Sequence, residues 1–465
     1  MAGYVPESNA GPVDWNDPRN VIAKSPMGTM QVLIIVITIC LNAMDGFDVA
    51  SISYASPGIA KEWGIDSGGL GIVLSMELWG MALGSMFLGG VADKIGRRRT
   101  ILGCITFMAI GMFLATTVRN PIELSIWRVV TGLGIGGMLA AINAAAAEFS
   151  NTRRRDLCVS LMSIGYPIGA VIGGLASKQL LVNHDWRSVF YLGAAASAVL
   201  IPTVLLFMPE SVHWLAQKQP AGALEKINKS LQHIGQRSVS ALPALNAATR
   251  KQSIKDIFRP GLINITLLVT AAYFFHIVTF YFILKWVPKI IVNFGFPAAS
   301  AAGVLMWTNV GGATGGALLG LLTQKYGVRG LTIGAMVLST IAVAAFGQTP
   351  ADLYVMSWIC AAAGFCTNAA IVGLYALFAK AFPTHVRATG TGFAIGVGRG
   401  GAALAPIVAG YLFQWGYALP VVALTMAAGS LFAAAVLLML KLGSEGSVQP
   451  ATQREPQRDL KRAEA

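Results

Sequence analysis

Long apolar runs recur along almost the whole chain, and they restrict the possible folds more than any other feature. Twelve runs are each long enough to cross a bilayer as a helix. Only 12% of the residues are charged, whereas soluble domains carry about 25%, and the mean hydropathy is +0.63. The sequence therefore predicts an all-α membrane protein with twelve transmembrane helices, at 29–53, 68–91, 99–118, 122–148, 157–181, 188–208, 262–286, 299–322, 330–348, 352–379, 388–412 and 417–441.

An internal repeat divides these runs into two sets of six. GGVADKIGRRRT at 89–100 is similar to GLLTQKYGVRGL at 320–331, and AEFSNTRRRD at 147–156 is similar to AKAFPTHVRA at 379–388. Both offsets are about half the chain, which indicates two bundles that rock about a central site. We expect five regions: a cytoplasmic tail, an N-terminal six-helix bundle, a cytoplasmic central loop, a C-terminal six-helix bundle and a disordered cytoplasmic tail, at 1–28, 29–208, 209–260, 261–442 and 443–465.

Basic residues are concentrated on alternate connections between the runs. They follow the second, fourth, sixth, eighth and tenth runs, and the connections on the other side are nearly charge-balanced. Because Lys and Arg mark the cytoplasmic side, both termini are expected in the cytoplasm. This topology accounts for the net charge of +13, so we expect no nucleic-acid partner. The five cysteines lie in or beside apolar runs, and we expect neither a metal site nor a cofactor.

Three short motifs resemble those of the major facilitator superfamily. The segment at 89–98 resembles its signature, and this resemblance implies a cytoplasmic latch between helices made by Gly89, Asp93, Gly96, Arg97 and Arg98, with Arg155 and Arg387 related to each other by the repeat. RVVTGLGIGG at 128–137 resembles the fourth-helix motif of proton-linked members, and PESVHWL at 209–215 resembles the exit of the sixth helix in the sugar, organic-ion and aromatic-acid branches.

The first run narrows the resemblance to one branch of that superfamily. AMDGFDVASISYASPGIAKEWGI at 43–65 resembles the first helix of the aromatic acid:proton symporter family, whose members include transporters of 4-hydroxybenzoate and protocatechuate. RATGTGFAIGVGRGGAALAP at 387–406 is similar to its eleventh helix. The likeness extends over nearly all of 30–440. The chain departs from the pattern at Gln324, Asn151, Glu77 and Lys285.

Asp45 and Asp48 are candidates for carrying a proton. They are three residues apart and share one helix face, and two acids in a poorly hydrated site cannot both ionise cheaply. The alternative is a structural pair that binds neighbouring helices. Glu77, expected to face the bundle interior, is added to the proton-coupling set, whereas Glu148 and Lys285 are expected nearer the membrane edges.

Arg399 is the leading candidate for substrate binding, because a guanidinium can hold a carboxylate with two hydrogen bonds. Alternatively it is the partner of Asp45 or Glu77. Arg128 is costly inside a spanning helix and is expected to face a cavity or a partner, unless it is interfacial. His276 lies among aromatic residues that suit a ring substrate or simply pack. Secondary contacts, or polar links between helices, are expected at Asn143, Asn309, Asn368 and Tyr375.

These features together predict a proton-coupled secondary transporter. We expect it to import an aromatic carboxylate, such as a hydroxybenzoate, protocatechuate or a lignin-derived aromatic acid, across the bacterial inner membrane by alternating access. Its partners would be the small acid, protons and membrane lipids, and we expect a monomer. The alternatives are a symporter of another organic acid, such as muconate or a short aliphatic acid, and an efflux carrier. An enzyme is not expected, because the sequence contains no metal-ligand cluster, nucleophile elbow or Walker loop.

Overall fold

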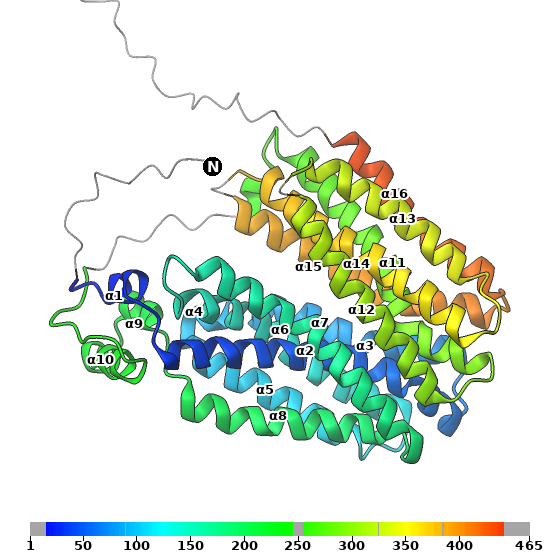
Figure 1. Cartoon of the computed structure of the whole chain (residues 1–465), viewed down its shortest axis with the longest axis horizontal. Coiled ribbons are helices and arrows are strands. Elements are labelled where there is room, and N and C mark those ends of the chain that lie inside the picture. Colours follow the sequence, from blue (N-terminus) through cyan, green and yellow to red (C-terminus); the bar gives the residue numbers. More distant parts are fainter. Residues whose placement is uncertain (1–14, 89, 245–253, 324, 384–385, 441–465) are drawn as a thin grey trace, which may run out of the picture.

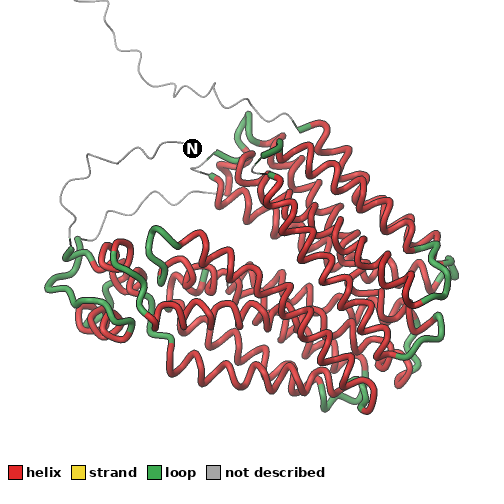
Figure 2. The backbone as a smooth tube through the Cα atoms, in the orientation of Figure 1, coloured by secondary structure: helices red, strands yellow, loops and turns green. Residues whose placement is uncertain are grey.

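The described residues fold into helices and connecting loops. A computed structural model describes residues 15–88, 90–244, 254–323, 325–383 and 386–440, and no strand occurs among them (Figure 2). The tail at 443–465, Gly89 and Gln324 therefore lie outside the described residues. The predicted all-α fold class is confirmed.

Six long helices form the N-terminal bundle (Figure 1). In this bundle α2 packs on α7, α3 on α6, and α5 on both α6 and α8. Two short helices, α1 and α4, lie beside it. The bounds are α1 (Pro18–Lys24), α2 (Thr29–Trp63), α3 (Ser67–Leu88), α4 (Val91–Ile95), α5 (Arg97–Ala115), α6 (Pro121–Glu148), α7 (Arg155–Asn183) and α8 (Arg187–Phe207).

Six further long helices form the C-terminal bundle, where α11 packs on α15 and α16, and α14 packs on α12 and α13. Between the bundles, the described residues form two short α-helices and one 3-10 helix. The bounds are α9 (Val212–Lys218), α10 (Ala223–His233), η1 (Ile254–Phe258), α11 (Ile263–Asn293), α12 (Ala298–Leu322), α13 (Val328–Phe346), α14 (Leu353–Ala381), α15 (Arg387–Gln414) and α16 (Leu419–Met439).

Eleven helices in the described part of the chain are long and apolar enough to span a membrane. The remaining long helix, α12, has 25 residues. Its hydropathy is lowered by its glycines, by two threonines and by Asn309, but it packs between α7 and α14. Lipid does not have to solvate its polar groups there, which is why a weakly apolar helix is tolerated at this place.

Two helices are longer than their apolar runs. The helix α2 continues through Pro57 to Trp63 and ends at Gly64, whose φ of 60° is left-handed. The helix α11 continues past the predicted end at 286, through Pro288, to Asn293. Each extension contains a proline that interrupts the apolar run, but Pro57 and Pro288 are both buried among neighbouring helices, which can satisfy the backbone groups that a proline leaves free. The apolar pattern alone therefore predicts C-terminal ends for α2 and α11 that come too early in the sequence.

The two bundles contact each other through α2, α3 and α7 on one side and α11, α15 and α12 on the other. Near the start of α3, a side-chain link between them joins Gln414 Nε2 to Asp66 Oδ2 at 2.7 Å. Toward the opposite end of the molecule, which carries α4, α9 and α10, the bundles diverge (Figure 1). The halves are thus joined at one end of the spanning helices.

Candidate functional site

The two acids of α2 are buried and have no partner. Asp45 is 2% exposed and Asp48 is fully buried. None of their four carboxylate oxygens accepts a hydrogen bond from the described residues. Gly46 between them lets α2 approach α7 closely, because a Cβ there would lie 2.0 Å from the Tyr166 carbonyl oxygen. Backbone contact of this kind holds the acids inside the N-terminal bundle.

Beside the two acids lies a buried cluster of one acid and two bases. Glu77 Oε1 is 2.6 Å from Arg128 Nη2, and Glu77 Oε2 is 3.3 Å from Lys285 Nζ. All three side chains are fully buried. Arg128 Nη2 also donates to the Asp48 carbonyl oxygen at 3.0 Å, and the guanidinium lies 5.4 Å from the centre of the Phe190 ring. Glu77 and Arg128 belong to the N-terminal bundle, whereas Lys285 comes from the C-terminal bundle.

The expectation that Lys285 lies near a membrane edge is therefore wrong. Its Nζ donates to the Val49 carbonyl oxygen at 2.5 Å, inside the interface between the bundles. Arg399 crosses the same interface, because its Nη1 donates to the Met81 carbonyl oxygen of α3 at 2.7 Å. No carboxylate among the described residues pairs with Arg399. Two cations of the C-terminal bundle thus bind backbone oxygens of the N-terminal bundle.

A cavity of about 60 Å³ lies between α7, α11, α12 and α14. Asn309 and Asn368 both line it, together with the aromatic side chains of Tyr166 and Phe280. Asn368 Nδ2 donates to the Gly312 carbonyl oxygen at 2.7 Å. The tertiary structure therefore brings together two amides that are 59 residues apart in the sequence, at a place where both bundles contribute to the wall.

Three other predicted substrate contacts lie apart from this cavity. His276 is fully buried in the C-terminal bundle, where its Nδ1 lies 2.8 Å from Ser430 Oγ and its Nε2 lies 2.9 Å from the Thr367 carbonyl oxygen. Both ring nitrogens are thus engaged by the bundle itself. The Tyr375 hydroxyl lies 3.2 Å from that of Tyr273, and Asn143 is exposed on α6.

The motif after α3 forms an ion-pair network within the N-terminal bundle. Arg97 lies 3.0 Å from Asp93 and 2.8 Å from Glu148, and Glu148 also accepts a hydrogen bond from the Ser211 hydroxyl. These contacts join α4, α5, α6 and the start of α9. The sequence-based prediction placed Asp93 and Arg97 in a latch but did not assign Glu148 or Ser211 to it. Glu148 ends an apolar run, and Ser211 lies in the PES motif, which is the signal that could have identified them.

Gly96 is the N-cap residue of α5 and has a φ of 105°, a conformation that favours glycine. A Cβ there would lie 2.2 Å from Glu210 Oε2. The Glu210 Oε1 atom accepts hydrogen bonds from the backbone N–H groups of Arg97 and Arg98, at 2.8 and 3.2 Å. A carboxylate at the start of α5 satisfies N–H groups that have no partner within the helix. Glu210 is thus a further residue that the sequence-based prediction missed.

Arg155 and Arg387, which the internal repeat relates to each other, form no such ion-pair network with the described residues. Arg387 Nε reaches the Phe382 carbonyl oxygen at 3.4 Å, and neither Arg155 nor Arg387 has an ion pair with a described residue. Arg98 Nη2 donates to the Leu205 carbonyl oxygen at 2.6 Å. The described part of the repeat is therefore symmetric in its helices but asymmetric in its charge contacts.

Two six-helix bundles that share a charged, buried interface define a class of protein, the secondary membrane transporters. The model of the Major Facilitator Superfamily matches this chain at residues 38–362 and again at 304–464. The chain belongs to that superfamily, and it is a multi-pass membrane transporter rather than an enzyme.

Curated relatives match over most of the chain. A gallate transporter of Pseudomonas putida is 28% identical, over 92% of this chain and 94% of its own length. A 3-(3-hydroxy-phenyl)propionate transporter of Escherichia coli is 29% identical, over 92% and 98%. The 4-hydroxybenzoate transporter PcaK of Acinetobacter baylyi is 28% identical, over 83% and 86%.

Among solved structures, the xylose transporter XylE from E. coli in its inward open conformation has a TM-score of 0.69 at 17% sequence identity. The match covers 90% of this chain and 98% of XylE. At this sequence identity, the match shows that the two chains share a fold.

Proposed function

We propose that this protein imports an aromatic carboxylate together with a proton across the bacterial inner membrane. The end that carries α4, α9 and α10 would face the cytoplasm, together with both termini. Two lines of support agree. Relatives that match over most of the chain are named as transporters of gallate, 4-hydroxybenzoate and 3-(3-hydroxy-phenyl)propionate, and the buried acids of α2 have no partner in the described structure.

Proton coupling is proposed because the carboxylates of Asp45 and Asp48 are buried without a hydrogen-bond partner among the described residues. Keeping a buried carboxylate charged without a partner is expensive, and binding a proton removes that expense. Arg128 is close enough to contact the Asp48 backbone, but its charge is already paired with Glu77. Asp45 and Asp48 are therefore free to exchange protons when the site opens to water.

The cavity lined by Asn309 and Asn368 supports a ring substrate. Its walls combine amide groups with the Tyr166 and Phe280 rings, and sites of this kind use a few polar groups to orient an apolar body. A cavity that holds benzene has a volume of about 150 Å³, so the observed 60 Å³ must enlarge. Parts of both bundles form the walls, and enlargement follows when the bundles separate.

The cations at the interface offer a way to couple binding to this movement. Lys285 and Arg399 each donate to a backbone carbonyl oxygen of the other bundle. Separating the bundles breaks these bonds and leaves one buried donor, Lys285, and one half-buried donor, Arg399, unsatisfied. A substrate carboxylate can accept from Arg399 with two hydrogen bonds, which offsets the loss. We therefore propose Arg399 as the residue that holds the carboxylate.

Uptake by purified protein in proteoliposomes tests this function, with the pH gradient and the membrane potential imposed separately. Moving a monoanion toward a negative interior costs about 2.3 kcal/mol per 100 mV. One accompanying proton cancels that charge, so a pH gradient that is acidic outside should drive accumulation of labelled 4-hydroxybenzoate or gallate, and potential alone should not.

Several outcomes would contradict parts of this scheme. Stimulation by potential alone would reject one proton per monoanion, and a requirement for sodium would reject proton coupling. Transport of muconate or a short aliphatic acid in preference to every aromatic acid would reject the substrate class. Accumulation only when the gradient favours exit would indicate an efflux carrier.

A further inference from the structure

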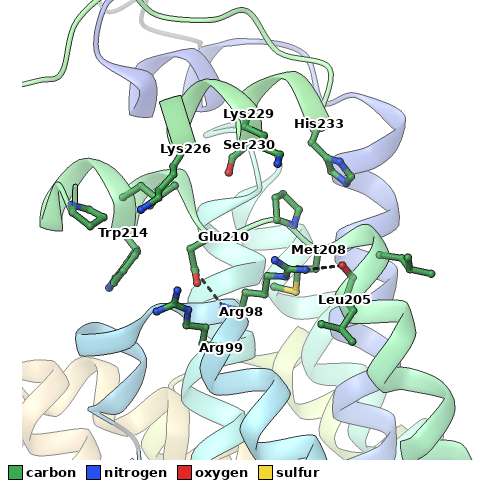
Figure 3. Close-up of a pocket in the computed structure, with 14 residues that line it drawn as sticks. Arg98, Arg99, Leu205, Met208, Glu210, Trp214, Lys226, Lys229, Ser230 and His233 are labelled. Atoms are coloured by element: carbon green, nitrogen blue, oxygen red, sulfur yellow. Dashed lines mark hydrogen bonds between the residues drawn. The ribbon is translucent and has the colours of Figure 1, made fainter. Parts of the chain in front are cut away.

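A second, larger pocket lies far from the interface between the bundles. It has a volume of about 510 Å³ and is enclosed by the start of α5, the end of α8, and the short helices α9 and α10 (Figure 3). Four of its side chains are cationic, and they approach from two sides. Arg98 and Arg99 project from α5, while Lys226 and Lys229 project from α10.

The cationic charge of this pocket is only partly offset by the protein. None of the four basic side chains forms an ion pair with a described residue. Arg98 donates to the Leu205 carbonyl oxygen, and Lys226 Nζ donates to the Ala221 carbonyl oxygen at 2.8 Å. The acid that lines the pocket, Glu210, is bound to backbone N–H groups at the start of α5 and at Ser211. The pocket therefore has an excess of positive charge.

The pocket also lies where a spanning helix leaves the membrane. The last residues of α8 are apolar and exposed: Leu205 by 48%, Leu206 by 68% and Phe207 by 38%. Leu205 and Leu206 line the pocket as well. Exposed apolar side chains on a spanning helix contact lipid tails. Basic side chains immediately beyond them are at the level of the lipid headgroups.

The helix α10 is built to present its lysines on this side. Ile227 and Leu231 are fully buried and attach the helix to the protein. Lys226, Lys229 and His233 have the spacing of one helix face, and all three line the pocket. This helix thus fixes positive charges above the end of α8.

We propose that this pocket binds the phosphate group of an anionic phospholipid, with the acyl chains lying along the end of α8. Basic pockets beside spanning helices are suited to acidic headgroups. A free phosphate ion would use the cationic side chains but not the apolar wall that Leu205 and Leu206 provide. The combination of both surfaces in one pocket is what points to a lipid.

Native mass spectrometry of the full-length protein in detergent tests this site, with phosphatidylglycerol and phosphatidylcholine added at matched concentrations. The unaltered protein should bind phosphatidylglycerol more tightly. In the double variant Lys226→Gln/Lys229→Gln this affinity should fall by about fivefold per lysine, while phosphatidylcholine binding stays unchanged. The matched control is Lys218→Gln on α9, an exposed lysine outside the pocket.

Equal binding of both lipids, or no loss in the double variant, would overturn the proposal. A competition with inorganic phosphate separates the two sources of the phosphate group. If inorganic phosphate displaces phosphatidylglycerol at an equal concentration, the pocket is a site for a free anion and the lipid assignment is wrong. A melting temperature of the double variant equal to that of the unaltered protein confirms that the fold is intact.

Discussion

At the scale of single residues, one buried acid forms ion pairs with two buried bases. Glu77 lies between Arg128 of its own bundle and Lys285 of the other bundle. Removing one partner of a buried pair costs more than replacing the whole pair by apolar groups, because it leaves an uncompensated charge. Substitutions at the three residues should therefore lower the free energy of unfolding by different amounts.

This asymmetry predicts different effects of two substitutions. Glu77→Gln leaves two buried cations without an acid and should destabilise the protein by about 3–5 kcal/mol. Lys285→Met leaves the Glu77–Arg128 pair intact and should have a much smaller effect. Thermal unfolding of the purified proteins measures both changes. A loss in Lys285→Met as large as that in Glu77→Gln would show that the charges are not balanced in this way.

The two acids of α2 give a second prediction at this scale. Asp45→Asn or Asp48→Asn removes a group that can bind and release a proton and should abolish uphill accumulation of substrate. Exchange of labelled for unlabelled substrate needs no net proton movement and should persist. Asp156→Asn, at an exposed position on α7, is the control. Uphill accumulation at the unaltered level in both α2 variants would reject the proton-carrier role.

At the scale of helices, the corner between α4 and α5 is held by contacts with two other helices of the chain, α6 and α9. Arg97 bonds Asp93 of α4 and Glu148 of α6, and Trp214 Nε1 of α9 donates to the Asp93 carbonyl oxygen at 3.1 Å. The network lies far from the cavity of Asn309 and Asn368. Its effect on transport must therefore be conformational.

Asp93→Asn should accordingly slow transport while leaving substrate affinity nearly unchanged. The Asp93 side chain is 73% exposed, so its ion pair contributes at most about 1 kcal/mol and the fold should survive. Lys94→Gln, at an exposed neighbour that forms no ion pair with a described residue, serves as the control. The turnover rate and the dissociation constant are measured separately. A large loss of affinity at unchanged turnover would contradict this role.

The close contact of α2 with α7 gives a prediction about packing. Gly46→Ala places a methyl group against the Tyr166 carbonyl oxygen, so the helices must move apart, and the melting temperature should fall. Gly103→Ala in α5 meets no atom within 4 Å and should leave the melting temperature unchanged or slightly raise it, since alanine favours helix by about 1 kcal/mol. Equal effects of the two substitutions would show that the contact is not tight.

At the scale of the whole molecule, the bundles are joined at the end where α3 begins and diverge at the other end. Alternating access requires this joined end to open during the cycle. Linking it covalently should therefore trap the protein in the present state.

A cross-linking experiment checks this expectation. In a protein whose five cysteines are replaced, Asp66→Cys and Gln414→Cys are introduced together, because the two side chains are in hydrogen-bond contact. A thiol cross-linker should block uptake by the double variant, and a reducible linker should allow recovery on reduction. The two single variants are the controls. Full uptake in the cross-linked protein would show that this end does not need to open.

The fold class and the family could be predicted from local patterns along the chain. Twelve apolar runs of spanning length leave a helical membrane protein as the available solution, because backbone polar groups in lipid must be bonded within the segment. The motif at 89–98 and the acids at Asp45 and Asp48 could also be read directly, since their meaning depends on local spacing. Local patterns of this kind can be recognised without knowing which helices are neighbours.

Contacts between groups that are far apart in the chain could be found only from the packing of the helices. The pairing of Glu77 with Lys285 joins residues 208 positions apart. It places Lys285 in the buried interface between the bundles, where the sequence suggested a membrane edge. The tertiary structure also shows that both ring nitrogens of His276 are hydrogen-bonded within the C-terminal bundle. It further shows that Glu148, Glu210 and Ser211 complete the network around Arg97. Hydropathy reports how apolar a segment is but not the direction in which each side chain points. The partners of buried charges are therefore set by helix packing, which no single run contains.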